Sequence, residues 1–434
     1  MPAIPRTHLP PRLLPILYFG VAHVALALAC LAVAVDPRGV SGFFYHSRMV
    51  AIVHLVTLGW ISTSILGSLY IVGPIALRMW IPATWLGYTA FTFVLVGVVG
   101  MVAHFWLEEY GGMAWSAIAV ASGIIAVGVH VAMCLRRASL PRAISAHIVF
   151  AFLNILGAAT LGVLIGFDKV YHFLPGFVLS NVIAHAHLAA IGWAAMMVVG
   201  IAYRLLLMIL PAAMPSGRAL WLSLVLLETG VVGLFLTLLL RSPIVRLAAL
   251  VVIGGFAAFI WQVVWMLRRP RPRPPGLRRR DPAVLHAGAS FASLGIASAL
   301  GMWLVIADPS STTLRVAMAY GVFGLVGFLA QIVVGMEGRL LPVFAWYWAY
   351  ANRGYKGPVP SQHEMPWRRG QEIAFVLWLV GVPTLAVSLA FDVAPLVSAG
   401  GWCLLAATLL DTVNIWSILR HAFLTTGSLS AVGS

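Results

Sequence analysis

The heptapeptide HLVTLGW at residues 54–60 returns as HLAAIGW at residues 187–193. The copies also share the spacing of a later glycine and a later tyrosine: Gly67 and Tyr70 in the first copy, Gly200 and Tyr203 in the second. Both lie inside long apolar stretches, where a histidine is costly unless its ring has a partner. Two histidines at equivalent points of two apolar helices, His54 and His187, therefore suggest a pair of metal ligands that face one another.

The composition indicates a membrane protein. Hydrophobic residues make up 62% and charged residues 9% of the 434 residues, which is far from the composition of a soluble domain. Apolar runs of about 20 residues mark membrane-spanning helices. We predict an all-α, polytopic membrane protein with twelve transmembrane helices, at residues 11–35, 43–73, 79–105, 114–135, 143–168, 180–210, 217–241, 244–267, 283–306, 313–342, 371–391 and 395–420. The segment 343–370 is then the longest loop.

The charge distribution predicts the orientation. A net charge of +15 could indicate a nucleic-acid partner, but the basic residues gather in the loops after the fourth, eighth and tenth predicted spans. Loops on the other side carry acidic residues: Glu108, Glu109, Asp168, Asp308 and Asp392. This asymmetry follows the positive-inside rule. We expect a multi-pass protein of the bacterial inner (cytoplasmic) membrane with both termini cytoplasmic, with membrane lipids as partners and no nucleic acid.

A third, degenerate copy of the motif indicates a repeat. Gly327-Phe328, Gly335 and Pro342 match Gly59-Trp60, Gly67 and Pro74, and Val322 stands at the histidine position. Three units of four spans, at about 11–135, 143–267 and 283–420, account for a single transmembrane domain over residues 1–434. The first helix of each unit also contains a histidine: His23, His147 and His286.

The depth of the histidines separates two groups. At ~1.5 Å per residue, His54, His185 and His187 lie at one level in the outer third of the membrane. His185 and His187 are two residues apart, so on a regular helix they point about 200° from one another. They would serve two centres on opposite sides of the sixth span. A haem fits this arrangement, because one imidazole can bind from above the iron and another from below.

The glycines that follow these histidines allow two interpretations. Gly59 and Gly192, with Gly67 and Gly200, keep the helix surface thin, which would let a macrocycle approach. Small residues also simply permit close packing of membrane helices. Trp60 and Trp193 lie about 240° around the helix from the histidines, so we expect them to pack the bundle.

The segment VIAHAHLAAIG at residues 182–192 resembles the HxHLAxxG helix of haem–copper oxidase subunit I, especially in the nitric oxide reductase and C-type branches. Residues 48–74 are similar to the second helix of that family, which supplies the other ligand of the low-spin haem. The twelve spans in three arcs of four, with both termini inside, match as well. NnrS proteins, which are haem- and copper-containing membrane proteins linked to nitric oxide, resemble the chain in size and in minimal extramembrane content.

The resemblance implies His54 and His187 as axial ligands of a low-spin haem b, and His185 as a ligand of a second haem or of copper on the other face of the span. Imidazoles on both sides leave no open position on the iron, so such a haem carries electrons and binds no gas. The chain departs from the family in two ways. The HxH motif lies in the sixth span and not the tenth, and the His-His pair of the family's copper centre is absent.

A copper site could be improvised from His46, His104 and His172, which we place nearest the outer surface. Three imidazoles suit copper or zinc, although histidines in interfacial loops are usually solvated.

Polar residues also occur within the spans: Glu228, Glu337, Asp411 and Asn414. Ionisable groups there can carry protons, and Asp411 with Asn414, one turn apart, is the better candidate. For Glu337, an ion pair with an arginine of the inner face explains the sequence equally well.

These observations predict a haem-binding membrane redox protein, with electron transfer through a bis-histidine haem b and reduction or handling of nitric oxide or oxygen. Whether it is an enzyme, an oxidoreductase, stays open. A cytochrome c or cupredoxin subunit is the expected electron donor. One alternative is a non-catalytic haem- or copper-binding protein for nitric oxide tolerance, sensing or metal delivery. Another is a transporter whose histidines bind substrate or protons.

Overall fold

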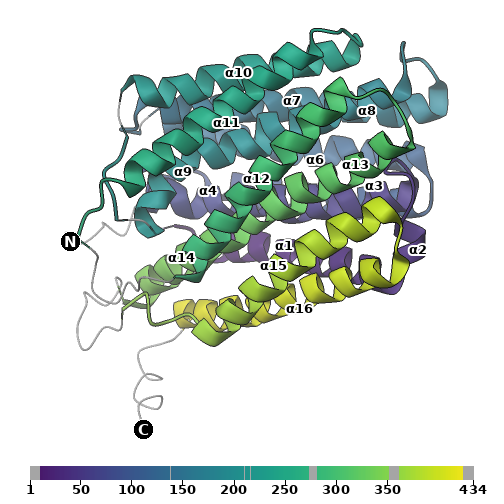
Figure 1. The fold of residues 1–434 in the computed structure, drawn as a ribbon. Helices are drawn as coiled ribbons and strands as arrows, with labels where there is room; N and C mark the ends of the chain where they lie inside the picture. Colours follow the sequence, from purple (N-terminus) through teal and green to yellow (C-terminus); the bar gives the residue numbers. More distant parts are fainter. Residues whose placement is uncertain are drawn as a thin grey trace.

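The computed structural model of the chain describes residues 10–136, 138–209, 211–215, 217–272, 281–350 and 361–423. These residues form long, roughly antiparallel helices (Figure 1). Twelve helical segments of the described residues are long and apolar enough to cross a membrane, as the sequence predicts. Nine are single helices: α1 (Leu13–Val35), α5 (Thr84–Trp106), α6 (Tyr110–Leu135), α7 (Arg142–Tyr171), α10 (Arg218–Leu239), α11 (Val245–Leu267), α12 (Pro282–Ile306), α15 (Arg368–Phe391) and α16 (Ala394–Leu419).

The second, sixth and tenth spans are each built from three segments. An α-helical half is followed by a π-helical stretch and then by a second α-helical half. They comprise α3 (Ser47–His54), η2 (Leu55–Ser62) and α4 (Thr63–Ile75); α8 (Val178–His187), η3 (Leu188–Ala195) and α9 (Met196–Ile209); and α13 (Ser311–Gly321), η4 (Val322–Ala330) and α14 (Gln331–Tyr350). Two short helices complete the fold, α2 (Pro37–Val40) and η6 (Arg420–Phe423).

The prediction of a loop over residues 343–370 is wrong for the first part of that segment. Helix α14 runs through Pro342 and ends at Tyr350. Proline removes one helical hydrogen bond, but Phe344 and Ala345 beyond it are fully buried, so packing holds the helix together past the break. The middle of the predicted loop lies outside the described residues.

The π-helical stretches mark the centre of the bundle. Each N–H of a π-helix bonds five residues back, which inserts a residue into the helical register, and such stretches are frequent at functional sites. Just after η2, the side-chain hydroxyl of Thr63 also donates to the Leu58 carbonyl, at 2.7 Å. The stretches begin at Leu55, Leu188 and Val322, at or next to the positions that the predicted repeat pairs. The repeat itself stays a prediction.

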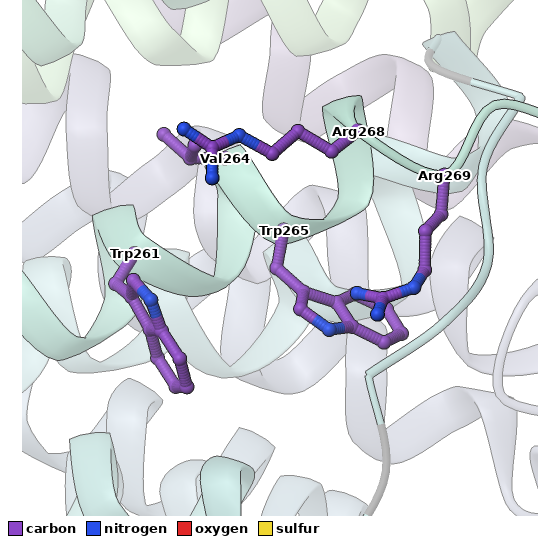
Figure 2. Close-up of a pocket in the computed structure, with 5 residues that line it drawn as sticks. All are labelled: Trp261, Val264, Trp265, Arg268 and Arg269. Carbon is purple, nitrogen blue, oxygen red and sulfur yellow. The ribbon is translucent and has the colours of Figure 1, made fainter.

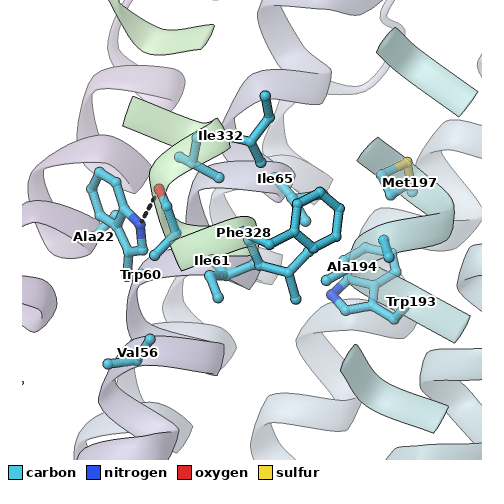
Figure 3. Packing of buried hydrophobic residues seen from close by; sticks show 14 of the residues in the cluster. Ala22, Val56, Trp60, Ile61, Ile65, Trp193, Ala194, Met197, Phe328 and Ile332 are labelled. Atoms are coloured by element: carbon cyan, nitrogen blue, oxygen red, sulfur yellow. Dashed lines mark hydrogen bonds between the residues drawn. The ribbon is translucent and has the colours of Figure 1, made fainter. Parts of the chain in front are cut away.

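Tryptophans join the three central spans at this level. The indole N–H of Trp60 donates to the Ala330 carbonyl of η4, at 3.3 Å, and that of Trp193 donates to the Ser62 hydroxyl of η2, at 3.0 Å. Figure 3 shows Trp60 and Trp193 on either side of Phe328. Phe328 stands at the tryptophan position of the third copy and has no N–H to donate. Both tryptophans are fully buried, which confirms that they pack the bundle.

The central spans separate toward one end of the molecule. The three π-helical stretches contact one another in pairs, whereas α3, α8 and α13 make at most sparse contacts with each other. These three halves lie at the right in Figure 1, opposite the end where α11 connects to α12. We call the latter the arginine-rich end, because Arg136, Arg268 and Arg368 lie in or beside its connections.

The tryptophan–serine contact should behave as a coupled pair. We expect Trp193→Phe and Ser62→Ala each to lower the free energy of unfolding by about 1 kcal/mol. The double variant should lose less than the sum, because both changes remove the same hydrogen bond. Reversible unfolding in mixed micelles measures this, and strictly additive losses would contradict the contact.

Candidate functional site

His54 ends α3 and points its ring away from its own helix axis. Its Nδ1–H donates to the Val50 carbonyl at 2.8 Å, and its ring lies beside Phe105 of α5 with a centroid distance of 5.0 Å. Because Nδ1 carries the proton, Nε2 keeps its lone pair. Nε2 has no hydrogen-bond partner among the described residues, so the ring is oriented and one nitrogen stays available to a ligand.

The two histidines of the HxH motif face different neighbours. His185 donates from Nδ1 to the Ala158 carbonyl of α7 at 2.8 Å, and its ring covers Gly162, where a Cβ would lie only 2.8 Å from Cε1. His187 donates from Nδ1 to Ile183 at 2.8 Å. Its Nε2 accepts from the Tyr320 hydroxyl of α13 at 3.0 Å. The two rings therefore contact different helices, α7 and α13, and their service to two separate centres stays a prediction.

His54, His185, His187 and Tyr320 lie on the helical halves α3, α8 and α13, which separate from one another. Each of the four residues is partly accessible, in contrast to the fully buried tryptophans of the central spans.

No hydrogen bond or ring contact among the described residues joins His54 with His187 or with His185, so the pairing expected from the sequence stays a prediction. His185 is near enough to His54 for their charges to influence one another. His187 contacts Tyr320 of the tenth span, and in the repeat alignment Tyr320 stands where His185 stands in the second copy.

The orientation of a ring through Nδ1 is typical of metal-binding histidines, whose second nitrogen is held by a carbonyl or carboxylate. It is not sufficient by itself, because His147 bonds the Ala143 carbonyl in the same way. His147 is completely buried, with an enclosed Nε2 that has no partner. His54 and His185 differ from His147 because they are only partly buried and their Nε2 atoms are not enclosed.

The outer histidines are not brought together. Nδ1 of His46 caps α3 by accepting the Met49 N–H at 3.3 Å, and burial lowers the pKa of His46, which keeps the ring neutral near pH 7. His104 bonds the Gly100 carbonyl at 2.6 Å and lies 3.7 Å from Glu109. His172 is exposed after the end of α7. The three do not form a set of converging ligand atoms in the described part of the chain, and we do not carry the copper site further.

The motif glycines face the first helix of each predicted unit. A Cβ on Gly59 would lie 2.5 Å from Ala25 of α1, one on Gly192 2.8 Å from Asn154 of α7, and one on Gly327 2.7 Å from Ser293 of α12. Of the two interpretations, these distances support close helix packing.

The histidines of the first helices are not equivalent. Gly200 packs on His147 and Gly335 on His286, but the matching Gly67 packs on Tyr18. His23 lies elsewhere, in a second polar cluster. Its Nε2 is 3.2 Å from Glu337 of α14, and the ligand atoms of His23, Glu337 and Asp411 of α16 all lie within 4.8 Å of one another. Thus Glu337 pairs with a histidine and not, as the sequence also allowed, with an arginine.

A surface hollow lies at the arginine-rich end of α11. It is lined by Trp261, Val264, Trp265, Arg268 and Arg269 (Figure 2). The guanidinium of Arg269 stacks on Trp265 at 4.1 Å from the ring centroid. Arginine beside tryptophan is typical of a membrane boundary, and the hollow contains no histidine or carboxylate that would make it a redox centre.

No protein-family model matches this chain, and no curated protein is significantly similar to it. The likeness to haem–copper oxidase subunit I therefore rests on the residues quoted above.

The close approach at Gly59 makes a stability prediction. Gly59→Ala places a methyl against Ala25, which we expect to cost about 1–3 kcal/mol of unfolding free energy through strain. Gly295→Ala is the matched control, because nothing lies within 4 Å of the added Cβ, and helix propensity should make it neutral or slightly stabilising. Thermal unfolding of the two purified variants in detergent compares them, and equal midpoints would contradict the packing.

Proposed function

We propose that this chain is a membrane haem protein that transfers electrons, related in plan to haem–copper oxidase subunit I. One observation carries the proposal: His54 and His185, on two central spans, have rings oriented through Nδ1 and available Nε2 atoms, and they are near enough for their charges to interact. We also propose that the protein lies in the bacterial inner membrane, with its arginine-rich end on the cytoplasmic side.

The residues around His54 and His185 fit a haem chemically. Neutral imidazole is a usual axial ligand of haem iron, and each ring has the backbone partner that fixes its tautomer. Phe105 beside His54 adds an apolar wall. These features support haem more than a solvated ion, which would need polar groups along the walls.

Two features support His185 as the partner of His54: the two charges are near enough to interact, and Nε2 of His185 is available. His187 is the weaker candidate, because its Nε2 already accepts the Tyr320 hydroxyl and would have to release it to bind iron. We therefore assign His54 and His185 to the haem b. The His187–Tyr320 pair then borders a second centre, a haem or copper, on the other side of the sixth span.

A bound haem would supply a one-electron redox couple. The chain's residues do the rest: Val50 and Ala158 orient the imidazoles, and the tight contact of the central spans excludes water from the arginine-rich side. Ligation on both faces leaves no position for a gas, so the chemistry assigned to this centre is electron transfer, with a cytochrome c or cupredoxin subunit as donor. Reduction of nitric oxide or oxygen would require the second centre.

Single substitutions separate the two ligand assignments. We expect His54→Ala and His185→Ala each to remove most of the haem from the purified protein, since each deletes an axial ligand. His187→Ala should keep this haem, and His286→Gln, which alters a buried histidine on another helix, should change nothing. Pyridine haemochrome assay and reduced-minus-oxidised spectra measure the haem.

The outcomes are distinguishable. Loss of haem in His54→Ala and His187→Ala with retention in His185→Ala would restore the pairing expected from the sequence. Wild-type haem in all three variants, or a folded wild type without any chromophore, would contradict the proposal.

Gly162 offers a test that leaves every ligand in place. Gly162→Ala puts a methyl 2.8 Å from Cε1 of His185, so the ring must move and its bond to iron must weaken. We expect a tenfold or greater rise in the fraction of high-spin haem in the absorption spectrum, with the fold intact. Gly295→Ala again serves as control, and an unchanged spectrum in Gly162→Ala would speak against His185 as a ligand.

A further inference from the structure

The second polar cluster lies where α1, α14 and α16 meet, far along the chain from the motifs discussed so far. His23 is 5% exposed, Glu337 1% and Asp411 4%. His23 also packs edge-on against Trp60, with ring centroids 5.1 Å apart. Three ionisable side chains from three helices are thus enclosed together in the interior of a membrane protein, where such groups are expensive and usually functional.

The hydrogen bonds fix the state of the histidine. The Thr412 hydroxyl donates its single proton to the Thr408 carbonyl at 2.7 Å. Toward His23 Nδ1, 2.9 Å away, Thr412 can therefore only accept, and Nδ1 carries a proton. Nε2 then faces Oε2 of Glu337 at 3.2 Å. In neutral histidine this would set a lone pair against a carboxylate oxygen, so the two atoms must share a proton or bind the same cation.

The carboxylates have unused oxygens. Oε1 of Glu337 and Oδ2 of Asp411 are buried without a hydrogen-bond partner, as is the amide nitrogen of Asn414 one turn further along α16. Leaving such atoms unsatisfied is costly. Two ionised carboxylates carry a charge of −2, so a single proton on His23 would leave the cluster negative, whereas a divalent cation makes it neutral.

We infer that His23, Glu337 and Asp411 form a binding site for a divalent transition-metal ion such as Mn²⁺, Fe²⁺ or Zn²⁺. One imidazole and two carboxylates are a donor set that these ions accept. Ligand atoms that share such an ion lie at most about 4.4 Å apart, given bonds of about 2.2 Å. The three ligand atoms lie within 4.8 Å of one another, so they need to approach only slightly to bind one ion. Thr412 holds the histidine through Nδ1, the usual outer partner of a metal-binding imidazole.

The site is independent of the proposed haem. Its ligands come from other helices, and none of them contacts His54, His185 or His187. If the metal site proves wrong, the haem proposal is unaffected. If the haem proposal proves wrong, the metal site is unaffected.

Manganese binding to the full-length protein tests the site. Purified protein is treated with chelator and titrated with Mn²⁺, and bound metal is followed by electron paramagnetic resonance. We expect one Mn²⁺ per chain, with ¹⁴N coupling from His23. Glu337→Gln and Asp411→Asn should weaken binding at least tenfold, and His23→Gln should abolish the ¹⁴N coupling. Thr412→Val should weaken binding about tenfold through its effect on His23.

Matched controls keep the test specific. Glu228→Gln changes a carboxyl that bonds Asn154 at 2.8 Å, and His286→Gln changes a buried histidine without a carboxylate partner among the described contacts. Both should bind Mn²⁺ like the wild type. If Glu337→Gln does not fold, Glu337→Asp replaces it, because this variant keeps the charge. We expect Glu337→Asp also to weaken Mn²⁺ binding.

Two results would overturn the inference. The first is Mn²⁺ binding that is equal in the wild type and in the three ligand variants. The second is a folded wild type that binds no Mn²⁺ but shows the infrared band of a protonated carboxylic acid that disappears in Glu337→Gln. That result would identify a proton as the occupant.

Discussion

The contact of three central helices at their π-helical stretches is the constraint on which the rest of the structure depends. Trp60 and Trp193 donate across this contact, and Gly59 and Gly192 let the first helices of two predicted units approach it. Because the helices are fixed at one level and not beyond it, α3, α8 and α13 separate toward one end. His54 lies on the separated half α3, and His185 and His187 lie on the separated half α8.

The buried polar groups of this protein differ in the partners that they have. Asn154 bonds both the Gly192 carbonyl and Glu228, which satisfies a carboxyl inside the bundle. His54, His185 and His187 each bond a carbonyl through Nδ1, and Nε2 stays available in His54 and His185. In the cluster around His23, Nε2 faces a carboxylate oxygen, and two further carboxylate oxygens are buried without a hydrogen-bond partner. Two different sites in one bundle thus follow from the same rule, that a buried polar atom needs a partner.

The sequence predicted the twelve spans well, because hydropathy and length decide them. Helical geometry also led us to expect different neighbours for His185 and His187, and they contact α7 and α13 respectively. The sequence did not predict the π-helical stretches, which change the register by one residue without a compositional signal. The predicted pairing of His54 with His187 stays a prediction. The hydrogen bond between His187 and Tyr320 had no sequence signal, because it joins two spans that are distant in the chain. The approach of Glu337 and Asp411 to His23 had no sequence signal, as the three lie on helices that are distant in the chain.

The central claim is that imidazoles of two central helices hold one haem in the space between α3 and α8. A cryo-electron microscopy map of the protein purified with its chromophore tests it most directly. The account predicts a flat density between these helices, in contact with Nε2 of both His54 and His185. A map in which side chains fill that space, or in which both rings point away from any such density, would contradict it.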